Sequence, residues 1–151
     1  MANSYLQFSE QLELSSEEEV AWVRRQLDDD LASERDWELP EDESFGFDWQ
    51  IIDEPAEGRR LSLHAEESGD PLAVGRFVQA YLKRFQPQGS FALTYACTCD
   101  KPRAGEFGGG AIFATAKSVD SFDAHEWASE RAEAGRLRAA SCTGPDRSDL
   151  R

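Results

Sequence analysis

One segment, Ser68–Phe85, constrains the fold more than any other part of the chain. Asp70 is a strong helix N-cap, and Pro71 suits the first helical position, where a missing N–H costs nothing. A wide apolar stripe follows at helical spacing before Pro87 and Gly89 end the helix. The stripe consists of Val74, Phe77, Val78, Tyr81, Leu82 and Phe85. Such a stripe must be buried, and we expect it to cover one face of a sheet.

Segments with period-two alternation surround this helix and predict strands with one buried side. They are Tyr5–Leu14, Phe45–Asp53, Arg59–Glu67 and Ser90–Cys99. A further helix is expected after Ser15 or Ser16, with Val20, Val23, Leu27 and Leu31 as its apolar stripe. The order β-α-β-β-α-β predicts an α+β fold of the ferredoxin-like, split βαβ type, with two helices on one face of an antiparallel sheet.

The chain continues beyond this unit. Residues 111–117 are apolar on both faces and predict a fifth strand that is central or covered on both sides. Residues 118–138 are interpreted as a loop and a C-terminal helix capped by Ser121 or Asp123. We therefore expect a single α+β domain over residues 1–138 and a flexible tail over residues 139–151.

The charge distribution is strongly uneven. The formal net charge is −14, and residues 1–57 hold 18 acids against three arginines, which gives −15 in that segment. Such a field repels nucleic acid and anionic membranes, and it attracts a basic protein surface. Because no apolar run approaches about 20 residues and no secretory signal precedes the first strand, we expect a cytoplasmic protein.

The acidic third also contains aromatic residues that could anchor a partner. Trp22 falls on the polar face of the first predicted helix, where it is either packed under a loop or open to a partner. The predicted partner site consists of Glu17, Glu18, Trp22, Asp28, Asp29, Asp30, Trp37, Glu41, Asp42 and Glu43. We expect this acidic protein-binding domain to act as an inhibitor that occupies the basic, nucleic-acid-binding surface of another protein.

A second hypothesis places a small-anion or metal-binding enzyme site in the loop Lys101–Gly110. Two basic side chains and three glycines could hold an anion there. The candidate residues are Lys101, Arg103, Gly108, Gly109 and Gly110. These glycines do not spell GxGxxG or precede GK[ST], so the same stretch is also interpreted as a tight strand–strand hairpin.

The cysteines and histidines do not assemble into a known centre. Cys97 and Cys99 share one strand face, yet a structural zinc site needs about four ligands, and His64 and His125 are not expected to converge on them. We therefore expect two buried, inert thiols and neither a metal nor another cofactor. A third hypothesis is a structural or oligomerising domain whose acidity only confers solubility.

The stretch TYACTCDKPRAGEFGGGAIFATA, together with the opening SYLQFSE, resembles a group of small uncharacterised bacterial proteins, some of them carried on mobile elements. That resemblance spans most of the first 120 residues or so and implies no activity and no site residue. A mobile-element context would favour the inhibitor hypothesis.

Overall fold

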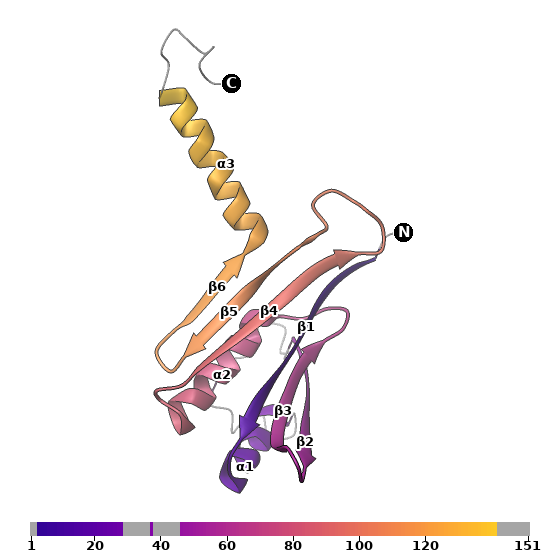
Figure 1. Cartoon of the computed structure of the whole chain (residues 1–151), viewed down its shortest axis with the longest axis vertical. Coiled ribbons are helices and arrows are strands. Elements are labelled where there is room, and N and C mark those ends of the chain that lie inside the picture. Colours follow the sequence, from indigo (N-terminus) through magenta and orange to yellow (C-terminus); the bar gives the residue numbers. More distant parts are fainter. Residues whose placement is uncertain (1–2, 29–36, 38–45, 142–151) are drawn as a thin grey trace.

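The structure is a computed structural model that describes residues 3–28, 37 and 46–141, with side chains placed as far as Arg136. Six strands and three helices follow one another along the described chain (Figure 1). They are β1 (Ser4–Leu14), α1 (Glu17–Leu27), β2 (Asp48–Glu54), β3 (Gly58–Ala65), α2 (Pro71–Phe85), β4 (Ser90–Cys99), β5 (Gly108–Thr115), β6 (Val119–Asp123) and α3 (Ala124–Ser141).

All strands belong to one antiparallel sheet in the order β2-β3-β1-β4-β5-β6. The strand β3 lies between β1 and β2, which is the split that gives the split βαβ plan its name. The predicted α+β class and the arrangement of the first six elements are therefore confirmed. Beside β4 the sheet continues with β5, which we predicted, and β6, which we did not. It therefore has one strand more than we predicted.

Helix α2 forms where the sequence predicts it. The Asp70 carboxylate accepts hydrogen bonds from the backbone N–H of Leu72 (3.0 Å) and of Ala73 (3.3 Å), and Pro71 opens the first turn. Most of the predicted stripe is fully buried against the sheet, with Phe77 and Tyr81 at its centre. Capping and burial thus act on the same segment and fix α2 on one sheet face.

Helix α1 buries part of the predicted stripe together with a side chain that we placed on the polar face. Its buried side chains are Glu19, Trp22, Val23, Gln26 and Leu27, so Val23 and Leu27 are buried as predicted, whereas Val20 is half-buried and Leu31 lies outside the described residues. Trp22 is buried because its indole packs on the aromatic rings of α2, with its centroid 5.8 Å from that of Phe77 and 5.7 Å from that of Phe85. Burying one large ring outweighs burying the smaller Val20 side chain.

One buried polar contact joins α1 to α2. The Tyr81 hydroxyl donates to the carboxylate of Glu19, a side chain only 4% exposed. The other carboxylate oxygen of Glu19 accepts from the backbone N–H of Ser15 (2.8 Å) and from the Ser16 hydroxyl (3.0 Å). Ser16, one of the two residues after which we expected the helix, is therefore its N-cap, and the Glu19 carboxylate that bonds to it also satisfies a buried tyrosine. Burial, and then the bond to Glu19, raise the pKa of Tyr81 well above its ordinary value.

Helix α3 leaves the sheet instead of packing on it (Figure 1). It starts directly after β6, and the Asp123 carboxylate caps it by accepting from the backbone N–H of Glu126 (2.9 Å), as predicted for Asp123. The helix extends to Ser141, so it includes residues 139–141, which we had assigned to the tail. The rest of the predicted tail lies outside the described residues.

Within the described ranges, no helix combines the length and the apolar character that crossing a bilayer requires.

The first prediction concerns the contact between Tyr81 and Glu19. Tyr81→Phe removes the hydroxyl and leaves a buried carboxylate without one of its donors, which should lower the free energy of unfolding by about 1–3 kcal/mol. Urea denaturation followed by tryptophan fluorescence measures this difference. The matched control is Tyr5→Phe on the half-exposed part of β1, which should unfold like the natural protein. Equal stability of both variants would mean that the buried hydrogen bond contributes nothing.

Candidate functional site

The acidic side chains of the predicted partner site are in part engaged by the chain's own arginines. Glu17 lies 2.5 Å from the Arg59 guanidinium on β3, and Glu18 lies 3.8 Å from that of Arg84 at the end of α2. Asp28 is the C-cap residue of α1. The other five predicted carboxylates, Asp29, Asp30, Glu41, Asp42 and Glu43, lie outside the described residues. The negative electrostatic potential at Glu17 and Glu18 is therefore weaker than two unpaired carboxylates would give.

The two tryptophans predicted as partner contacts are part of the core. Trp22 is 1% exposed and Trp37 is 8% exposed, and both rings pack on Phe77. The indole N–H of Trp37 donates to the backbone carbonyl of Gln26 (3.4 Å). Their prediction as surface anchors is corrected, because each ring fills space between α1, α2 and the sheet. No partner can reach either ring without disrupting this packing.

The predicted anion loop is a hairpin whose glycines belong to a strand. Gly108, Gly109 and Gly110 pair with Cys97, Ala96 and Tyr95 of β4, so their backbone takes part in the sheet ladder. Lys101 and Arg103 are exposed in the preceding loop. The hairpin interpretation is confirmed, and the glycines do not form a separate cradle of backbone amides.

At two of these glycines, the missing side chain leaves space for His125 and Tyr95. A Cβ atom at Gly108 would lie 2.7 Å from Cδ2 of His125, and one at Gly110 would lie 2.6 Å from the Tyr95 hydroxyl. His125 donates through Nε2 to the carbonyl of Phe107, and Tyr95 donates to the Asp123 carboxylate (3.3 Å). The glycines therefore let the start of α3 dock onto β5.

A cavity of about 350 Å³ adjoins this junction, on the sheet face that carries α1 and α2. Cys97 and His125 contribute to its wall, and Glu106 accepts from the Ser4 hydroxyl (2.5 Å) at its rim. The remaining lining residues are Tyr5, Leu6, Glu67, Ser68 and Gly105. Across the part of the chain that the structure describes, no group of three His, Cys, Asp or Glu side chains is arranged to hold a metal ion.

The thiol of Cys97 is not activated as a nucleophile. Partial burial, and then the negative charge of Asp123, raise the pKa of Cys97 above its ordinary value. A nucleophilic cysteine needs the opposite environment, in which a cation or a helix N-terminus stabilises the thiolate. The surroundings of Cys97 in the cavity wall therefore favour the neutral thiol over the thiolate.

The second prediction tests this electrostatic control of Cys97. Asp123→Asn removes the negative charge but keeps a side chain that caps helices well, so the pKa of Cys97 should fall and its alkylation by iodoacetamide should become several-fold faster near pH 8. The rate is measured in a background with Cys99→Ser and Cys142→Ser, in which Cys97 is the only thiol. The control Asp120→Asn removes a charge from the other face of β6 and should leave the rate unchanged. Equal alkylation rates in both variants would contradict an effect of the Asp123 charge on the pKa of Cys97.

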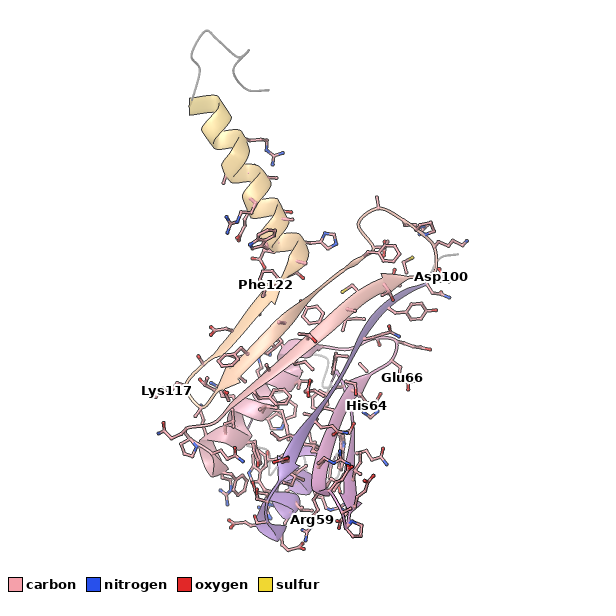
Figure 2. The ribbon with its side chains drawn as sticks, viewed as in Figure 1. Arg59, His64, Glu66, Asp100, Lys117 and Phe122 are labelled. Carbon is pink, nitrogen blue, oxygen red and sulfur yellow. The ribbon has the colours of Figure 1, made fainter. Side chains whose placement is uncertain are left out.

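The opposite face of β4, β5 and β6 carries an exposed apolar surface. Phe113 is 44% exposed and Phe122 is 47% exposed, and the strand pairing places both on the face away from α2, because Phe122 lies opposite Ala111. The exposed Ala92, Thr94 and Ala96 lie on the same face of β4. We call Ala92, Thr94, Ala96, Ala111, Phe113 and Phe122 the open face. Figure 2 labels Phe122 where β6 meets α3.

The base of α3 extends the open face. Trp127 is 49% exposed, and its ring centroid lies 6.5 Å from that of Phe122. The Arg131 guanidinium lies over the Trp127 ring at 5.2 Å. Three of the four large apolar side chains that are exposed among the described residues thus gather at the junction of β5, β6 and α3. A soluble monomer rarely exposes such a cluster without a function.

The exposed apolar surface on β5, β6 and α3 was not predicted from the sequence. We expected residues 111–117 to be central or covered on both faces. The strand β5 is central, between β4 and β6, but none of the helices that the structure describes covers its Phe113 face. Alternation over Val119–Asp123 would have revealed β6, because Val119 is partly buried against the core whereas Phe122 points outward. Acidic residues within that segment obscured the pattern.

Comparison with protein-family models, with curated proteins and with solved structures gives no match to this chain.

Proposed function

We propose that this protein is a binding domain that holds another protein chain on the open face and on the base of α3. The observation that carries the proposal is the uncovered cluster of Phe113, Phe122 and Trp127 on one side of a sheet whose other side is filled by helices. Aromatic side chains are enriched in protein interfaces, where they bury large areas at low entropic cost.

The flat character of the open face supports a protein ligand over a small molecule. Its alanines and Thr94 project little from the strands and surround the two phenylalanines. Small-molecule sites are usually concave and enclose most of the ligand, whereas protein interfaces are broad. The described cavity beside Cys97 lies on the other side of the same strands.

The acidic surface gives less support to a basic partner. Both tryptophans in its predicted site are buried, and Glu17 and Glu18 have arginine partners within the chain. An inhibitor that occupies a nucleic-acid-binding surface stays a prediction that depends on the Asp28–Asp30 run. We assign the contact surface to the open face instead.

The third prediction tests this contact surface directly. A photo-crosslinking amino acid, p-benzoylphenylalanine, replaces Phe113 or Phe122 in cells that naturally produce the protein. Both positions should give covalent adducts with a protein chain, because an interface brings the reactive ketone against partner side chains. The matched control replaces Ile52 on β2, at the other edge of the sheet, and should give no adduct.

A second arm separates the two candidate surfaces. In a variant with Asp28→Asn, Asp29→Asn and Asp30→Asn, the crosslinks from the open face should persist. Loss of the crosslinks in that variant would favour the acidic surface, and failure to crosslink from both Phe113 and Phe122 would overturn the proposal.

A further inference from the structure

We infer that the chain held on the open face is a second copy of this protein, and that the two α3 helices run antiparallel in a two-fold symmetric dimer. This inference rests on the proposed function and specifies its partner. A two-fold interface uses the same surface on both subunits, so one patch per chain is sufficient.

The exposure of α3 supports a partner for this helix. Every side chain from His125 to Arg136 is exposed, and the helix extends away from the sheet (Figure 1). Helices in proteins gain most of their stability from packing against other elements rather than from the propensity of their residues. An apolar or small-residue surface from outside the subunit would supply that packing.

The order of charges along α3 supports an antiparallel partner helix. Glu126, Glu130 and Arg131 lie in the first half of α3, a net charge of −1, whereas Glu133, Arg136 and Arg138 lie in the second half, a net charge of +1. Placed antiparallel, the acidic half of one helix lies beside the basic half of the other. A parallel arrangement would bring like charges together, so the charge order selects the antiparallel one.

The distribution of net charge along the chain restricts where two copies of this acidic protein can meet. The whole chain has a net charge of −14, but Gly108–Ser141 contains five acids and four bases, a net charge of −1. Two copies that approach through this segment keep most of their like charge apart, and repulsion between them falls within about 8–10 Å at physiological salt. The segment that contains β5, β6 and α3 is thus nearly neutral, in contrast to the rest of the chain.

The lengths of the elements also fit. Eighteen residues of helix span about 27 Å, whereas three adjacent strands span about 10 Å. An antiparallel partner helix that starts at its own Trp127 can therefore reach across the base of α3 and cover the open face of the first copy. Each subunit would then cover Phe113 and Phe122 of the other.

Light scattering coupled to size-exclusion chromatography tests the assembly over a series of micromolar concentrations. The full chain should elute with the mass of a dimer, and Phe122→Ser should shift it to the monomer. The matched control Ile52→Ser should remain dimeric and folded by circular dichroism. A natural protein that is monomeric at every concentration would overturn the inference.

Charge exchange tests the antiparallel arrangement. The variant with Glu126→Arg and Glu130→Arg should be monomeric, as should the variant with Arg131→Glu and Arg136→Glu. Mixing the two variants should restore a dimer that contains one chain of each. A charge order that only stabilises an isolated helix would leave the mixture monomeric, and this result would overturn the antiparallel dimer.

The two proposals fail in different ways. Crosslinks from Phe113 or Phe122 to a different protein, with a monomeric chain in light scattering, would keep the proposed function and overturn the dimer. The absence of any crosslink would overturn both.

Discussion

The packing of aromatic rings around Phe77 determines how the molecule is layered. Trp22 from α1, Trp37 and Phe47 all contact this one side chain of α2, and all are buried. These contacts hold both helices on the same sheet face, since each ring loses its partners if either helix moves away. Among the described residues, both α1 and α2 therefore lie on one face of the sheet, and no described helix covers the other face of β4 to β6.

The acidity of the chain is partly organised into contacts within the fold. Arg59 and Arg60 of β3 each lie near two carboxylates, which include Asp53 and Glu57 on the β2–β3 hairpin. These pairs lie near the surface and contribute little to stability individually. They do show that acidic residues in the first third of the chain form ion pairs with basic residues of β3. The negative electrostatic potential that a partner meets is therefore weaker than composition alone suggests.

Much of the fold follows from local sequence rules, and the rest depends on tertiary packing. Asp70, Pro71 and the apolar stripe predict α2, because capping and helical periodicity agree there. The stripe predicted for α1 was right for Val23 and Leu27 but left out Trp22, since periodicity could not weigh a single large ring against Val20. The short strand β6 was missed because Asp120 and Asp123 interrupt its apolar pattern. The candidate site could not be predicted, because an apolar residue such as Phe113 in a central strand is expected to be buried. Only the structure shows that none of the described helices covers it.

Asp123 takes part in several interactions where β6 meets α3. Its carboxylate caps α3, accepts from Tyr95 and contributes negative charge near Cys97, while the adjacent His125 lines the cavity. His125 lines the cavity on one side of the β4–β6 strands, and Trp127, two residues further along α3, extends the open face on the other side. The first turn of α3 therefore borders both surfaces, so a substitution there can alter either of them.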